Sequence, residues 1–402
     1  MESQTASVFP PPPPKPRRFT TRVVLALVLI GLLCGGFVGY AVTYVDFNAK
    51  LISLQSQLGN QSSSGGSSNT YLLSDNANVS LADLYAQVKD SVVVIKDIVS
   101  QYSFFGGLMG YTVQQGSGFV VKVNNQLVVV TNNHVVENSI NITVTFANGD
   151  SLPATVLGSD PNADLAILSV SSMPSYAVAL TLVSSTTLQV GDPVVAVGSP
   201  YGLSGTLTTG IISSLGRTIT VSDSGTNSQT IADMIQTSTA INSGNSGGPL
   251  INYAGEVVGI TTAAVSDSEG LGFAVPSSTI IREINSLVTT GSYDKHPSIN
   301  AAGIDMNYQI AQAMGTTTTY GWLVESVSTQ NGLEGGDTQK SIMGSQVIIG
   351  GDIIIAINDQ RITNGDDMLS YLERHALPGQ TMSFTVIRDG ETQTAQVTIG
   401  KA

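Results

Sequence analysis

Short apolar segments rich in β-branched residues recur from about residue 91 to residue 276, separated by Gly, Asn, Asp and Ser. Segments of this length, bounded by turn-forming residues, are typical of strands in an all-β barrel protein. We therefore expect a mainly β domain over residues 75–290. The 402 residues leave room for a second folded domain and for additional segments.

A different hydrophobic pattern lies near the N-terminus, where residues 23–45 carry no charge. As a helix this stretch would extend about 34 Å at ~1.5 Å per residue, enough to cross a bilayer. Basic residues precede it and Asp46 follows, which predicts a cytoplasmic N-terminus and an extracytoplasmic body. A cleaved signal peptide, with Gly39 and Ala41 at the cleavage site, is the alternative. We favour an uncleaved anchor because the apolar run exceeds the usual core of a signal peptide.

Two polar segments flank the predicted span. Residues 1–22 form a basic tail that contains the polyproline run Pro10–Pro14. Residues 46–74 begin with apolar residues at helical spacing and continue into a Ser- and Gly-rich linker. Three Asn-x-Ser/Thr sequons are candidate glycosylation sites, and they begin at Asn60, Asn78 and Asn141.

The segment Gly244–Leu250 reads Gly-Asn-Ser-Gly-Gly-Pro-Leu and offers a candidate nucleophile, Ser246. Acyl transfer requires an exposed hydroxyl and backbone N–H groups aimed at the developing oxyanion. Glycines on both sides of the serine allow a tight turn. We expect the oxyanion hole within Gly244, Asn245 and Ser246, with the N–H groups of Gly244 and Ser246 as donors. A Gly/Ser-rich turn without chemistry is the alternative.

A serine nucleophile needs a base and a carboxylate that orients the base. His134 lies where a β-branched run meets a polar turn, whereas His296 stands in a linker and His375 in a helical stretch. Asp160 precedes a proline and is typical of a turn, whereas Asp164 opens the apolar run that follows. We therefore predict a catalytic triad of His134, Asp164 and Ser246.

The triad segments resemble the catalytic blocks of the HtrA/Deg serine proteases, and further blocks follow the same order to the C-terminus. The resemblance implies two six-stranded β-barrels of the chymotrypsin type, with the site between them, and a homotrimer or a multiple of trimers. Ser238 and Ser243 depart from the family, which often has aspartate and proline at these positions. The matching blocks are Gly116–Phe119, Thr131–Val136, Asp164–Leu168, Gly198–Leu203, Gly210–Arg217, Gly244–Leu250 and Gly270–Pro276.

Composition narrows the function further. Only 11% of residues are charged and the net charge is −13, which argues against nucleic-acid binding. The single cysteine, Cys34, excludes a disulfide framework within the chain and zinc clusters ligated by several thiolates. No His-Glu-x-x-His motif is present, so we expect no metal and no cofactor.

The chymotrypsin-like layout places Ala240, six residues before the nucleophile, at the base of the primary specificity pocket. Gly259 and Thr261 are expected in a pocket wall. Because Ala240 carries no charge, we predict cleavage after small or medium aliphatic residues.

Residues 297–402 resemble a PDZ domain. Tyr320, Gly321, Trp322 and Leu323 resemble its carboxylate-binding loop and first groove strand, and Asp366–His375 is expected to be the groove helix. Such a domain binds peptide C-termini by β-augmentation, in which the peptide adds a strand to the sheet.

Together these features predict a membrane-anchored serine endopeptidase that hydrolyses unfolded or damaged extracytoplasmic proteins through an acyl-enzyme, as part of protein quality control. The alternative is a membrane-tethered chaperone or peptide-binding scaffold with little proteolysis.

Overall fold

The computed structural model describes residues 80–102, 107–199, 205–222, 228–242, 244–262, 271–329 and 331–402. The chain divides into two units, residues 1–73 and 74–402, and the described residues all belong to the second. The predicted tail, membrane span and linker lie outside the described residues, as do Asn60 and Asn78. Within the described part of the chain, no helix has the length and apolar character needed to cross a membrane.

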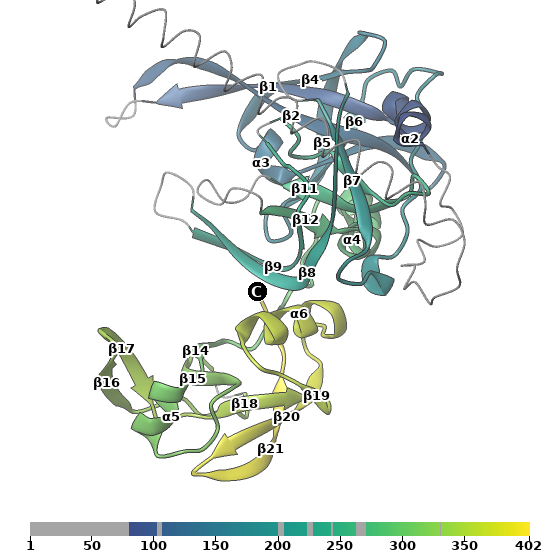
Figure 1. Ribbon diagram of the computed structural model, residues 1–402. Helices are drawn as coiled ribbons and strands as arrows, with labels where there is room; N and C mark the ends of the chain where they lie inside the picture. The colour runs from purple at the N-terminus through teal and green to yellow at the C-terminus, as the bar shows by residue number, and fades with distance from the viewer. Residues whose placement is uncertain are drawn as a thin grey trace, which may run out of the picture. The chain divides into compact units, whose positions relative to one another are not determined.

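Six strands close the first barrel in the order β1-β2-β3-β6-β5-β4 (Figure 1). Helix α2 (Leu81–Val88) and the 3₁₀ turn η1 (Lys89–Ser91) precede the barrel, and helix α3 (Asn133–Val136) follows β3. The strands are β1 (Val92–Tyr102), β2 (Leu108–Val123), β3 (Gln126–Thr131), β4 (Ser139–Thr145), β5 (Ser151–Asp160) and β6 (Leu165–Val170).

A second closed barrel follows in the order β10-β11-β12-β9-β8-β7. The 3₁₀ turn η2 (Ser185–Thr187) lies before it and helix α4 (Ser277–Thr290) after it. The strands are β7 (Pro193–Gly198), β8 (Thr206–Ser222), β9 (Ser228–Thr237), β10 (Pro249–Ile251), β11 (Val257–Thr262) and β12 (Gly272–Pro276). The two six-stranded barrels expected from the family resemblance are confirmed.

Many strands of these barrels are continuous apolar runs and do not alternate apolar and polar residues. The reason is that both faces of such a strand are buried. In β3, Val129 packs with Leu168 inside the first barrel. Its neighbours Val128 and Val130 point to the opposite face and belong to a buried cluster that also contains Ile251 of the second barrel. One hydrophobic core therefore joins the barrels at the boundary where the predicted site should lie.

The C-terminal region forms a six-stranded sheet in the order β14-β15-β18-β20-β21, with β19 paired to β18. Two short two-stranded sheets accompany it, β13 with β22 and β16 with β17. The helices are α5 (Tyr308–Met314) and α6 (Gly365–His375). The strands are β13 (Pro297–Ser298), β14 (Ala301–Asp305), β15 (Trp322–Val327), β16 (Thr338–Ile342), β17 (Ser345–Ile349), β18 (Ile353–Ile357), β19 (Gln360–Arg361), β20 (Thr381–Arg388), β21 (Glu391–Thr398) and β22 (Gly400–Lys401).

Candidate active site

His134 lies in α3, the single helical turn that begins as β3 ends. Its Nδ1 lies 2.8 Å from Asp164 Oδ2, and its backbone N–H donates to Asp164 Oδ1 over 3.0 Å. Since a carboxylate only accepts hydrogen bonds, Nδ1 carries the proton. In the neutral ring, Nε2 is then an acceptor and can take a proton from a hydroxyl.

The pKa of His134 is raised above its ordinary value. Burial of the ring lowers the pKa, but the hydrogen bond to Asp164, the charge of Asp164 and the charge of Glu137 together outweigh burial. The carboxylate therefore orients the ring and stabilises its protonated form, as a base in acyl transfer requires.

Asp164 is buried in a tight turn and has a positive φ of 51°. Its backbone N–H donates to the Pro161 carbonyl over 3.0 Å, and its own carbonyl accepts from Asn132 Nδ2 over 2.9 Å. Thr262, the last residue of β11, donates its hydroxyl to Asp164 Oδ2 over 3.1 Å. The carboxylate thus meets donors from both barrels. No sequence motif pointed to Thr262, which stands next to the predicted wall residue Thr261.

Ser246 lies in the turn Gly244–Gly247 between the barrels, in a buried position. Gly247 has φ +85°, and a Cβ there would approach the Ser117 carbonyl oxygen to less than 3.0 Å. Only glycine therefore fits at this point of the loop. The loop is held against β2 by two hydrogen bonds, from Ser117 N–H to the Ser246 carbonyl (2.8 Å) and from Ser117 Oγ to the Gly244 carbonyl (2.6 Å).

The loop Gly244–Gly247, which carries Ser246, and the helical turn α3, which carries His134, meet at Gly116. A Cβ at Gly116 would lie 2.7 Å from Val135 Cγ1 and 3.2 Å from the Ser246 carbonyl oxygen. Val135 directly follows His134 in the chain, so the two segments that carry the predicted base and nucleophile converge on this glycine. The third triad member, Asp164, contacts His134 directly.

Asn245 lies between the two predicted oxyanion donors, Gly244 and Ser246. Its own N–H, which was not expected to be a donor, is directed to the Asn242 carbonyl over 2.9 Å. Ser243, one of the two departures from the family, lies outside the described residues. At the other departure, Ser238 Oγ accepts the N–H of Ile211 over 3.0 Å and joins the end of β9 to β8.

The predicted pocket residues have different environments. Ala240, the predicted pocket base, is exposed. Thr261 is fully buried and donates its hydroxyl to the Asn245 carbonyl over 2.7 Å, so its side chain braces the nucleophile loop instead of lining an open pocket. A Cβ at Gly259 would lie 2.8 Å from the Val275 carbonyl oxygen, because β12 pairs closely with β11 there. Residues 263–270, which continue from β11, lie outside the described residues.

The strand pairing contradicts the prediction that Trp322 and Leu323 form the groove strand. Trp322 pairs with Asp305 of β14 and Ile354 of β18, and Leu323 likewise pairs on both sides. An interior strand has no free backbone edge to offer a peptide. The Tyr320 ring instead lies beneath the Arg361 guanidinium, 4.3 Å from its carbon.

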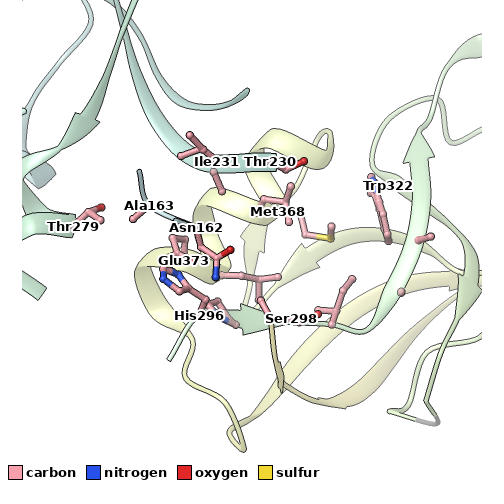
Figure 2. Close-up of a pocket in the computed structure, with 18 of the residues that line it drawn as sticks. Asn162, Ala163, Thr230, Ile231, Thr279, His296, Ser298, Trp322, Met368 and Glu373 are labelled. Atoms are coloured by element: carbon pink, nitrogen blue, oxygen red, sulfur yellow. Dashed lines mark hydrogen bonds and ion pairs between the residues drawn. The ribbon is translucent and has the colours of Figure 1, made fainter. Parts of the chain in front are cut away.

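A groove is present one strand away. Among the described strands, β14 pairs only with β15 in its sheet and forms an edge, and α6 spans the segment Asp366–His375 predicted to be the groove helix. A cavity of about 500 Å³ lies along β14 and α6 and is lined by Trp322 as well, while residues of the protease domain, among them Asn162 and Ile231, line its other side (Figure 2). Its lining on the two elements consists of Ala301, Ala302, Gly303, Met368, Leu369 and Leu372.

A group of potential metal ligands lies apart from the triad. Within the described part of the chain, Asp160, Glu283 and His296 place ligand atoms within 4.8 Å of one another. Asp160 and His296 already hydrogen-bond to each other, and Arg282 is paired with Glu283. A cation would have to break these bonds, so the group is arranged as an ionic network rather than as an open metal site.

Comparison with known proteins agrees with this geometry. The model of the trypsin-like peptidase domain matches residues 116–260, and the PDZ domain model matches residues 318–399. The serine protease Do-like HtrA of Lactococcus lactis subsp. cremoris is 33% identical over 92% of this chain and 95% of that protein. A probable periplasmic serine endoprotease, DegP-like, of Brucella suis is 36% identical over 71% of this chain and 52% of that protein. The solved structure of the HtrA-type protease AlgW with a decapeptide has a TM-score of 0.58 at 27% identity and covers 81% of this chain and 99% of that one.

The two barrels, the nucleophile loop and the C-terminal sheet define a trypsin-like serine endopeptidase followed by a PDZ domain. The chain belongs to the HtrA/DegP family of serine proteases.

Proposed function

We propose that this protease hydrolyses peptide bonds through an acyl-enzyme on Ser246, with His134 as base and Asp164 as the residue that orients it. The observation that carries the proposal is the double contact of Asp164 with the ring Nδ1 and the backbone N–H of His134. This contact directs Nε2 away from Asp164, toward the side where a nucleophile must approach.

In the first half-reaction, the Ser246 hydroxyl attacks the scissile carbonyl while His134 Nε2 takes its proton. The N–H groups of Gly244 and Ser246 stabilise the oxyanion, and the imidazolium then protonates the leaving amine. In the second half-reaction, water attacks the acyl-enzyme and the same groups act again. Asp164 remains ionised throughout and stabilises the imidazolium.

We assign the substrates to unfolded or damaged extracytoplasmic proteins cleaved after small or medium aliphatic residues. The uncharged Ala240 at the predicted pocket base supports this preference. A peptide library digested by the full chain tests the assignment, and preferred cleavage after Arg or Lys would contradict it.

The PDZ domain is proposed to bind peptide C-termini in the groove between β14 and α6. The open backbone edge of β14 can pair with an added strand, and apolar side chains of α6 provide a surface for the peptide side chains. AlgW, a similar protein, has been solved with a decapeptide.

We further propose a single-pass anchor at residues 23–45, extracytoplasmic protease and PDZ domains, and a homotrimer or multiple of trimers. The uncharged span with basic residues before it supports the anchor. A DegP-like relative is described as periplasmic, which supports the location. Resistance of the protein to carbonate extraction and light scattering in detergent test the anchor and the assembly.

Fluorophosphonate labelling tests the chemistry directly. We expect stoichiometric modification of the wild-type chain at Ser246, no labelling of Ser246→Ala, and casein digestion by the wild type alone. A chaperone or scaffold without proteolysis would show no labelling in the presence of substrate. The oriented His134 and Asp164 pair disfavours that alternative.

A further inference from the structure

A buried histidine joins three distant segments of the chain. His296, just before β13, is 5% exposed. Its Nε2 lies 2.6 Å from Asp160 Oδ2 at the end of β5, and its Nδ1 lies 2.9 Å from Glu373 Oε1 on α6. Figure 2 shows His296 and Glu373 side by side at the groove. Because carboxylates only accept, both ring nitrogens must carry protons, and the ring is an imidazolium.

The groups around this ring balance its charge. Arg282 of α4 donates to Glu373 Oε1 over 2.6 Å and to Glu283 Oε1 over 2.5 Å. Burial raises the pKa of Glu283 to about 8, so this carboxyl is protonated at neutral pH. Two cations, Arg282 and His296, then face two anions, Asp160 and Glu373. Tyr293 adds an aromatic ring at 5.0 Å from the His296 ring.

Asp160 belongs to the turn that ends at Asp164. Its Oδ1 accepts the N–H of Asn162 over 3.0 Å, and the N–H of Asp164 returns to the Pro161 carbonyl. The positive φ of Asp164 is unfavourable for a residue with a Cβ, so surrounding contacts must hold it. One oxygen of Asp160 accepts a hydrogen bond at the start of this turn, while the other contacts His296. The position of the Asp164 carboxylate therefore depends on where His296 holds Asp160.

We propose that His296 is a positioning residue for peptide hydrolysis: it holds Asp160, and thereby the turn that presents Asp164 to His134. Its second contact, with Glu373, fixes the plane of the imidazolium and ties the catalytic turn to the helix beside the groove. This inference rests on the proposed triad of His134, Asp164 and Ser246.

The test uses the full chain and a fluorogenic peptide with valine at the cleavage site. We expect His296→Gln to lower kcat about tenfold with KM changed less than about twofold, since small misplacement of a catalytic group reduces turnover. The rate of fluorophosphonate labelling should fall in parallel. His296→Arg, whose guanidinium can donate to carboxylates on two sides, should restore most of kcat.

Lys295→Gln is the matched control, because Lys295 is the exposed neighbour in the same segment and should leave kcat unchanged. Thermal unfolding of each variant shows whether the fold is retained. If the His296→Gln variant retains kcat within about twofold, or if kcat and the unfolding midpoint fall together without rescue by arginine, the positioning role is wrong. Failure of the triad itself would appear separately, as residual hydrolysis by Ser246→Ala.

Discussion

Thr262 donates its hydroxyl to the carboxylate of Asp164 over 3.1 Å, and this bond links β11 of the second barrel to the catalytic turn of the first. Asp164 is buried, so each of its acceptors needs a donor. The hydroxyl of Thr262 thus supports the carboxylate from the second barrel, while His134 supplies donors from the first. Because Asp164 takes hydrogen bonds from both barrels, the geometry of the site depends on how the two barrels are aligned.

Replacing Thr262 by valine should weaken catalysis without removing any triad member. The change keeps the shape but leaves a buried acceptor without its donor, a cost of about 1–3 kcal/mol. We expect kcat/KM to fall about tenfold and the unfolding midpoint to drop modestly, with Thr262→Ser close to the wild type. Equal activity of the valine and serine variants in a steady-state peptide assay would contradict this role.

The acid limb of activity should lie above the ordinary pKa of histidine. Burial lowers the pKa of His134, but Asp164 and Glu137 raise it by more, so the net shift is upward. The base must be neutral to accept a proton, and activity is therefore lost as pH falls through this raised pKa. A profile of kcat/KM against pH measures the value. A midpoint below the ordinary value of 6.5 for the wild type, or one that Asp164→Asn leaves in place, would speak against the contact as its cause.

Apolar runs in the sequence predicted a mainly β domain, the family resemblance implied the two barrels, and short motifs singled out the three residues of the predicted triad. Apolar runs bounded by turn residues mark strands, and His134, Asp164 and Ser246 each stand at the end of such a run or in a glycine-rich turn. These signals are local, since each depends on residues within a few positions. The structure brings His134 into contact with Asp164 as the motif predicts.

Residues whose role depends on a partner far along the chain gave no such signal. Thr262 lies 98 positions from its partner Asp164 in the sequence, and His296 lies 136 positions from Asp160. Neither contact can be recognised from neighbouring residues. The groove was misplaced by one strand for a related reason. Gly303 and Gly321 each precede an apolar residue, and only the pairing order shows that β14 is the edge.

Gly247→Ala should destabilise the nucleophile loop much more than alanine at an open glycine. A Cβ at Gly247 would collide with the Ser117 carbonyl oxygen, in a backbone conformation that already disfavours a side chain. We expect a loss of about 2–4 kcal/mol in the free energy of unfolding, together with loss of activity. Gly149→Ala is the control, because Gly149 also has a positive φ but no atom within 4 Å of a Cβ. Similar losses for both variants in urea unfolding would show that backbone strain alone decides the cost.

The ionic network around His296 should make the fold less stable at alkaline pH. The pKa of His296 is raised to about 10, because the hydrogen bonds and charges of Asp160 and Glu373 exceed the lowering by burial. Because the pKa is higher in the folded state, the protonated ring stabilises the fold. This contribution is fully present below the unfolded pKa of 6.5 and is lost as pH rises through about 10. Glu283 also lowers the stability of the fold as pH rises, between pH 4.5 and about pH 8, because its buried carboxyl favours the protonated form.

The midpoint of thermal unfolding should therefore fall as the pH rises from 5 to 10. The free energy of unfolding should fall by a total on the order of a few kcal/mol over this range. Glu283→Gln should flatten the part of this curve below about pH 8, and His296→Gln the part above about pH 7. Below the unfolded pKa of Glu373 the trend reverses. The pKa of Glu373 is lowered, because His296 and Arg282 outweigh its burial, so its contribution is lost as pH falls. A midpoint that rises between about pH 7 and about pH 10 would exclude this account of the network.

Peptide binding distinguishes the groove beside β14 from the loop that the sequence favoured. Leu369 of α6 lines the cavity and is half-buried there, whereas Tyr320 lies beneath Arg361. In the full chain carrying Ser246→Ala, we expect Leu369→Ser to weaken binding of a decapeptide with an aliphatic C-terminus about tenfold, through lost apolar contact. Tyr320→Ala should bind within about twofold of the parent, since its ring is not part of the groove. Fluorescence anisotropy measures both affinities, and the reverse order of effects would return the binding site to Tyr320–Leu323.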